Sequence, residues 1–127
     1  DEWAHAGQYR SYLDAAHQVD QWLRELWNFL QADPQYRNNT TLLITTDHGR
    51  GDVKKEEWTS HGASIRGADE IWIAAMGPFT PHAQMIRQVS HFRQQQLAAT
   101  IAALMGYQFT AGHPVAEPIR ILYSEQK

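Results

Sequence analysis

The sequence contains no cysteine, so neither disulfide bonds nor thiolate metal ligands contribute to this chain. It also lacks any apolar run close to the roughly 20 residues of a membrane-spanning helix, and we expect no membrane span. Basic residues are not in surplus, because 11 Lys and Arg face 14 Asp and Glu, for a net charge of -3. Nucleic acid is therefore not an expected partner. Internal repeats and low-complexity segments are absent as well.

The composition is that of one globular domain. The chain has 127 residues, of which 43% are hydrophobic and 11% aromatic, enough for a hydrophobic core. The sequence begins with Asp1 rather than Met. We therefore expect a processed chain or a piece of a longer protein.

The run from Thr41 to Gly49 reads TLLITTDHG and predicts a buried strand followed by a tight turn. Asp47 and His48 come at the carboxyl end of this strand, and ligands of open α/β sheets bind at that edge. A carboxylate beside an imidazole can bind a divalent cation there. An Asp-His-Gly turn that only closes the strand is the alternative, and it is the commoner use of such a tripeptide.

Two further segments carry side chains of the same chemistry. Asp1 and His5 are four residues apart, which places them on one face of a helix, although a solvated terminus explains them equally well. His61 lies in the segment from Arg50 to Gly67, which is rich in charge and glycine and is predicted to be a loop. A lone loop histidine is usually a surface residue, so His61 gains weight only from the other motifs.

Hydrophobic periodicity predicts the remaining elements. A long amphipathic helix runs from about Gln8 to Gln31 and stops at Asp33-Pro34, with its aromatic residues assigned to the core. The other expected elements are a second buried strand over Ala68–Met76, a helix over Phe92–Met105 that ends at Gly106 and covers one face of the sheet, and a short strand over Ile119–Tyr123. We assign His17, His82 and His91 to the surface.

The order of these motifs resembles the alkaline phosphatase superfamily. The resemblance depends on Asp1-x-x-x-His5, on TDHG ending at Gly49, and on His61-Gly62 followed by IWIAAMGP at residues 71–78. It is nearest to the type I phosphodiesterase/nucleotide pyrophosphatase and phosphoglycerate mutase-like branches. It covers the chain from Asp1 to about Gly106, which corresponds to the C-terminal part of such an enzyme. Ala4 departs from the pattern, because many relatives have glycine before the histidine.

This resemblance implies a fold and a cofactor. The fold is α/β, a partial alkaline-phosphatase-like sheet flanked by helices with the N-terminal part missing, so that residues 1–127 form the C-terminal metal-binding part of a larger catalytic domain. Two divalent ions about 4 Å apart are implied. The first ion would be held by Asp1, His5 and His61, and the second in part by Asp47 and His48. Imidazoles and carboxylates without thiolates suit zinc, with manganese or magnesium as alternatives.

The resemblance also implies a reaction. It indicates a hydrolase or transferase, such as a phosphodiesterase, that acts on phosphate or sulfate esters. In much of the family a metal-activated Ser or Thr attacks phosphorus and forms a covalent intermediate. That catalytic nucleophile and a further Asp ligand belong upstream of Asp1. We therefore expect this chain alone to be inactive, with the N-terminal part of the same protein and a small-molecule ester as its partners.

Two other classes of function fit the same residues. The chain could be a non-catalytic module that binds one structural metal ion, or a protein partner through exposed aromatic side chains. It could also be a small hydrolase that activates water directly at a three-ligand zinc site. Metal stoichiometry and turnover distinguish these readings.

Overall fold

The longest element of the computed structural model, which describes residues 1–81 and 91–122, is helix α2, Tyr9–Ala32. Its bounds agree with the prediction to within one residue. It follows the short helix α1, Glu2–His5, from which it is separated by Gly7 with a positive φ of 69°. Glycine adopts this left-handed conformation without strain, which ends α1 and turns the chain into α2. At the other end Asp33 is extended, as residues before proline usually are.

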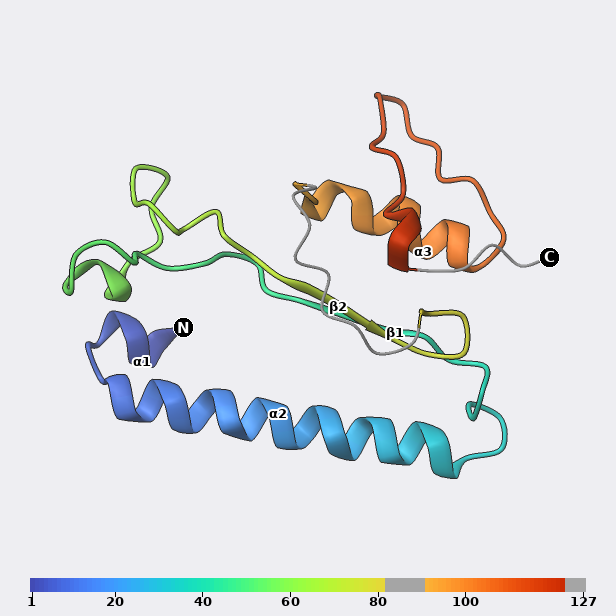
Figure 1. Cartoon of the computed structure of the whole chain (residues 1–127), viewed down its shortest axis with the longest axis horizontal. Helices are drawn as coiled ribbons and strands as arrows, with labels where there is room; N and C mark the ends of the chain where they lie inside the picture. Colours follow the sequence, from blue (N-terminus) through green and yellow to red (C-terminus); the bar gives the residue numbers. More distant parts are fainter. Residues whose placement is uncertain (82–90, 123–127) are drawn as a thin grey trace.

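The assignment of the α2 aromatic residues to the core is wrong for several of them. No residue of α2 is buried, and Trp22 and Phe29 are each 59% exposed. Tyr12 and Trp27 are half-buried. The outer side of α2 stays exposed because the described part of the chain supplies no second layer to cover it (Figure 1). None of the described helices has the length and apolar character needed to cross a membrane.

The sheet of the described residues has two strands, β1, Leu42–Thr45, and β2, Ile73–Met76. They pair antiparallel, with Leu42 opposite Met76 and Thr45 opposite Ile73. Helices and a small sheet confirm the α/β prediction in its coarse form. Strand β2 is shorter than predicted because residues around Gly67, which has a φ of 88°, turn before the strand begins.

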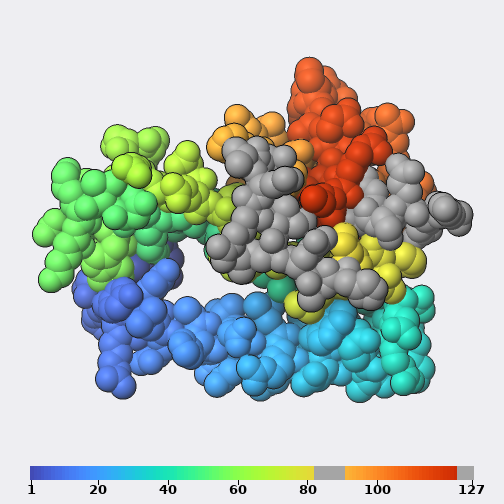
Figure 2. All heavy atoms as spheres, viewed as in Figure 1, coloured from blue at the N-terminus to red at the C-terminus, as the bar shows by residue number. Residues whose placement is uncertain are grey.

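Antiparallel pairing decides where the connecting loop lies. Since β1 ends beside the start of β2, residues 46–72 leave and return at the same edge of the sheet. This loop contains a short 3-10 helix, η1, Glu57–Thr59, which lies against α1. Figures 1 and 2 show the N-terminal segment and the loop meeting at one end of the molecule. The predicted loop and the predicted N-terminal motif are therefore neighbours in space.

Helix α3, Leu97–Leu104, ends at Gly106, which has a φ of 78°, as predicted. It begins later than predicted because the 3-10 turn η2, Gln94–Gln96, precedes it. The helix does not pack tightly on the sheet. Instead, a cavity of about 370 Å³ is lined by Leu43 of β1 and by Ile101 and Leu104 of α3.

The predicted strand over Ile119–Tyr123 is wrong where the structure describes it. Arg120–Leu122 form a 3-10 helix, η3, and Tyr123 lies outside the described residues, as does His82. The reason is local: the Ile119 side chain is 1% exposed, and its N–H donates to the Thr100 hydroxyl of α3 at 2.9 Å. This hydrogen bond ties the segment to a helix, so it is not free to join a sheet.

The whole chain exposes more surface than a closed monomer of its mass. Its accessible surface is 9997 Å², whereas a folded monomer of 14.6 kDa exposes about 6,900 Å² by the usual scaling with mass. Among residues 1–81 and 91–122 few side chains are fully buried, the largest being those of Ile119 and Thr100. The excess is of the size covered in a large permanent interface.

Gly49 fixes the close approach of the two ends of the loop. Its N–H donates to the Ala68 carbonyl oxygen at 2.8 Å, and a methyl group on Gly49 would overlap the carbonyl oxygens of Gly67 and Glu70. Its φ is not in the left-handed region. Glycine is therefore required by close backbone contact, rather than by the tight turn that the sequence suggests.

We predict that Gly49→Ala lowers the free energy of unfolding by about 1–3 kcal/mol, because the backbone of residues 67–70 must move to admit the methyl group. Urea denaturation followed by circular dichroism measures this change. Gly112→Ala is the matched control, since nothing lies within 4 Å of its added methyl group. Equal denaturation midpoints for the two variants would contradict the prediction.

Candidate metal centre

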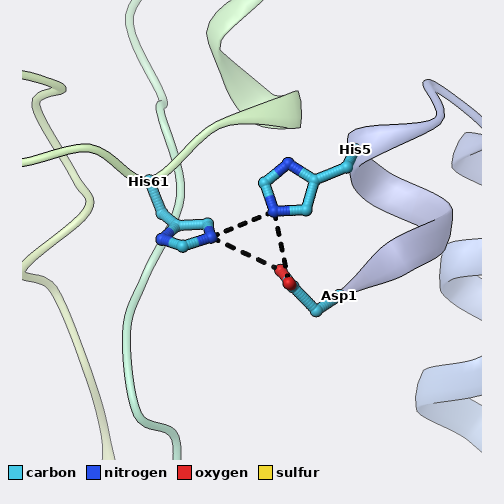
Figure 3. Close-up of side chains that lie close together, drawn as sticks. All are labelled: Asp1, His5 and His61. Atoms are coloured by element: carbon cyan, nitrogen blue, oxygen red, sulfur yellow. Dashed lines mark hydrogen bonds and ion pairs between the residues drawn. The ribbon is translucent and has the colours of Figure 1, made fainter.

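Three side chains predicted to bind metal lie together at the meeting point of α1 and the loop. The ligand atoms of Asp1, His5 and His61 all lie within 4.8 Å of one another. His5 Nε2 is 3.0 Å from His61 Nε2 and 3.2 Å from Asp1 Oδ2, and His61 Nε2 is 3.7 Å from Asp1 Oδ1 (Figure 3). The three side chains point toward one another from segments 56 residues apart in sequence.

Helix α1 places two of these candidate ligands on one face. The Asp1 carbonyl oxygen accepts hydrogen bonds from the N–H groups of Ala4 and His5, at 3.0 and 3.2 Å, which closes the helical turn. Ala4 is completely buried and anchors this turn. The alanine that departs from the family pattern is thus accommodated by a regular helical backbone, with Asp1 and His5 on the side that faces the loop.

His48 and Asp47 lie beside the same three residues. The ring of His48 stacks on that of His61 at 3.6 Å between centroids. His48 Nδ1 is 2.8 Å from the Gly49 carbonyl oxygen, which favours the tautomer with hydrogen on Nδ1 and a free lone pair on Nε2. That Nε2 is 3.7 Å from Asp1 Oδ1 and from Asp47 Oδ2. His48 is therefore gathered with Asp1, His5 and His61, and Asp47 lies next to His48 with its side chain 87% exposed.

The end of β1 is held in place by a side chain from another element. Gln94 of η2 donates from Nε2 to the carbonyl oxygens of Thr46 and Asp47, at 2.9 Å each. Because these carbonyls belong to the segment that carries Asp47 and His48, the contact fixes their backbone. No pattern in the sequence points to Gln94.

Arg50 is the principal residue of this centre that the sequence analysis missed. Its side chain is 13% exposed, and Nη2 contacts the Asp1 carboxylate. Nη2 is also 3.4 Å from the Asp1 carbonyl oxygen, and Nη1 is 3.5 Å from that of Trp58. The guanidinium lies 5.5 Å from the ring centroid of Tyr12. The available signal was its position directly after Asp-His-Gly, where a cation can balance ligand carboxylates.

Aromatic packing joins the start of α2 to the loop. The rings of Tyr9 and Trp58 meet edge to face at 5.3 Å, and those of Tyr12 and Trp58 lie 5.9 Å apart. Such pairs add stability beyond the area that they bury. They hold α1 and α2 against η1 and so keep Asp1 and His5 near His61.

The surroundings of His61 favour its neutral ring. Partial burial lowers the pKa of His61 from its ordinary value of 6.5, and positive charge on His48, His5 and Arg50 lowers it further, while a backbone hydrogen bond opposes the shift. A metal ligand must be the neutral imidazole. The site therefore presents His61 in the form that binds a cation at neutral pH.

The donor set fits a zinc ion. Two imidazole nitrogens and one carboxylate oxygen are a frequent protein set for catalytic zinc, in which the fourth position stays open to water or substrate. Asp1 and His5 are about half exposed, so solvent reaches that position. Among residues 1–81 and 91–122, no other group of three such side chains meets the same distance criterion. Asp47 and His48 offer two further donors at the rim.

Comparisons with protein-family models, with curated proteins and with solved structures gave no match for this chain. Assignment of the centre therefore depends on the donor set and on its geometry. The strongest feature is the convergence of Asp1, His5 and His61.

The lowered pKa of His61 predicts a pH dependence of stability. Between the folded pKa and 6.5 the unfolded chain binds more protons at this position than the folded chain, so the free energy of unfolding increases with pH. Stability should fall as the pH drops from neutral through 6.5. Urea midpoints measured across this range should show a smaller slope for His61→Asn, whereas His17→Asn, on the exposed side of α2, keeps the parent slope. A parent-like slope for His61→Asn would refute the assignment of this pH dependence to His61.

Proposed function

We propose that this chain supplies the metal-binding part of a hydrolase or transferase that acts on phosphate or sulfate esters, as its resemblance to the alkaline phosphatase superfamily suggests. One observation carries the proposal: three ligand-type side chains from two distant segments lie within 4.8 Å of one another. Asp1 and His5 come from α1, and His61 comes from the loop after β1.

In this proposal the residues divide between two divalent ions. Asp1, His5 and His61 hold the first ion, and Asp47 and His48 provide part of the second site, with zinc best suited and manganese or magnesium as alternatives. When bound, the ions supply Lewis-acid stabilisation of the oxygens at the reacting phosphorus or sulfur. The chain's own contribution is to fix these donors. The His48 Nδ1 contact with Gly49 orients that ring, and Gln94 holds the backbone of Asp47.

The catalytic nucleophile and the remaining ligand of the second ion are proposed to lie in the rest of a larger catalytic domain. The large exposed surface supports this, because 9997 Å² exceeds what a closed monomer of this mass exposes. Both faces of the two-stranded sheet are only half-buried. A further part of the same protein that covers them would complete the core and bring in the nucleophile.

A second candidate function is hydrolysis by a single ion that activates water directly. It is favoured by the one three-ligand group found among the described residues and by its open side. A module that binds one metal ion without turnover shares this geometry. Ester hydrolysis by the 127-residue chain alone would favour direct activation of water. If one ion binds tightly and no longer protein that contains the chain hydrolyses an ester, the non-catalytic metal-binding module is favoured.

We predict that His61→Ala weakens zinc binding by the chain by more than the roughly 10–100-fold expected for loss of an outer-sphere partner, because a direct ligand is removed. Isothermal titration calorimetry measures the dissociation constant. His17→Ala, on α2 and exposed, is the matched control and should bind zinc like the parent. Equal zinc affinity in His61→Ala and His17→Ala would disprove the metal assignment.

The catalytic part of the proposal requires a longer protein that contains this chain. There, His61→Ala should lower metal content and the hydrolysis of phosphate or sulfate esters together, because one change removes a ligand needed for both. Metal analysis and a chromogenic ester assay report the two quantities. Full hydrolysis in a variant that has lost metal would overturn the proposed mechanism.

A further inference from the structure

We propose that Arg50 and a metal ion held by Asp1, His5 and His61 together form a binding site for an oxyanion. This inference rests on the proposed function and deepens it, because it assigns a residue to the anionic group of the substrate. The guanidinium contacts the Asp1 carboxylate, which would be a metal ligand in the proposed function. An anion bound to the open side of the ion would therefore have a fixed positive side chain beside it.

The hydrogen-bonding capacity of Arg50 supports this role. A guanidinium has five N–H donors. Within the described residues, Nη2 uses its donors on the Asp1 carboxylate and the Asp1 carbonyl, and Nη1 has one long contact of 3.5 Å with the Trp58 carbonyl. Donors on Nη1 and Nε remain for another acceptor. Phosphate and sulfate oxygens match the planar guanidinium fork well.

The charge of the centre also depends on Arg50. The Asp1 carboxylate would cancel one of the two charges of the divalent ion, while neutral imidazoles add nothing. The occupied site then carries one positive charge without Arg50 and two with it. A partly buried cation, 13% exposed, keeps its field better than a solvated one. The occupied centre is therefore built to attract an anion.

A purely structural role for Arg50 is the competing explanation. Its contacts with the Asp1 carbonyl, the Trp58 carbonyl and the Tyr12 ring would also fasten α1 to the loop. If fastening were its role, loss of Arg50 would displace Asp1 and weaken metal binding. If Arg50 binds the anion, its loss weakens anion binding, while the metal ion loses only a repulsive neighbour.

The experiment measures the two affinities separately on the 127-residue chain. Co²⁺ is titrated first, followed through its visible absorption, and inorganic phosphate is then titrated into the Co²⁺-loaded protein. We expect Arg50→Gln to weaken phosphate binding by about 10-fold, the size expected for loss of a charge-assisted hydrogen bond, with no loss of Co²⁺ affinity. Arg50→Lys keeps the charge and should lose less.

Arg24→Gln is the matched control. Arg24 also pairs with a carboxylate, that of Asp20 at 3.4 Å, but on the exposed surface of α2. It should leave both affinities unchanged. Unchanged phosphate affinity in Arg50→Gln, or a fall in Co²⁺ affinity that matches the fall for phosphate, would overturn the role of Arg50.

The outcomes separate this inference from the proposed function. A parent chain that binds no Co²⁺ overturns the metal centre and the inference with it, whereas Co²⁺ binding with parent-like phosphate affinity in Arg50→Gln overturns only the inference. If Arg50→Gln fails to fold, Arg50→Lys decides. A severalfold loss of phosphate affinity at constant Co²⁺ affinity supports the role, and equal phosphate affinity refutes it.

Discussion

The carboxylate of Asp1 is the contact on which the arrangement of the centre depends. It lies within 4 Å of side-chain nitrogens of His5, His48, His61 and Arg50. Arg50 carries a fixed positive charge, and the Asp1 carboxylate balances it among the three imidazole rings. One carboxylate therefore holds α1 against the loop that leaves β1. A divalent ion shared by Asp1, His5 and His61 would replace these contacts with stronger bonds at the same place.

The fold brings these groups together through two simple features. Antiparallel pairing of β1 with β2 returns the loop to the edge from which it left, and Gly49 allows the two ends of the loop to touch. The rings of Tyr9, Tyr12 and Trp58 then dock the corner between α1 and α2 onto η1. Closing segments more than 50 residues apart costs chain entropy that grows only slowly with separation, so a few such contacts suffice.

Local patterns in the sequence predicted the parts of the structure that local physics controls. The bounds of α2 and the end of α3 followed from apolar periodicity and from Pro34 and Gly106, because helix termination is a property of the neighbouring backbone. The prediction of a strand over Ile119–Tyr123 was wrong because the Ile119 N–H donates a hydrogen bond to the Thr100 hydroxyl, 19 residues away. The predicted burial of the α2 aromatic residues was wrong for a similar reason. Burial depends on which other elements cover the helix, and the sequence of the helix does not show this.

The candidate site shows the same difference between features set by local sequence and features set by distant contacts. Asp1, His5, Asp47, His48 and His61 could be predicted as ligands because carboxylates and imidazoles are recognisable by type and their motifs by order. Arg50 was missed because its position directly after Asp-His-Gly does not tell that its guanidinium turns inward to meet a carboxylate 49 residues away. Residues that orient ligand side chains or balance their charge, without binding the ion themselves, can be recognised only from the three-dimensional structure. In the proposed centre, their role is to set the charge and the orientation of the ligands.

The central claim is that Asp1, His5 and His61 bind one metal ion, and crystals of the chain grown with zinc would test it most directly. Anomalous diffraction at the zinc edge should show a peak bonded to Nε2 of both histidines at about 2.0–2.1 Å and to an Asp1 carboxylate oxygen at about 2.0–2.2 Å. A zinc peak at other residues, or none between these three side chains, would contradict the account.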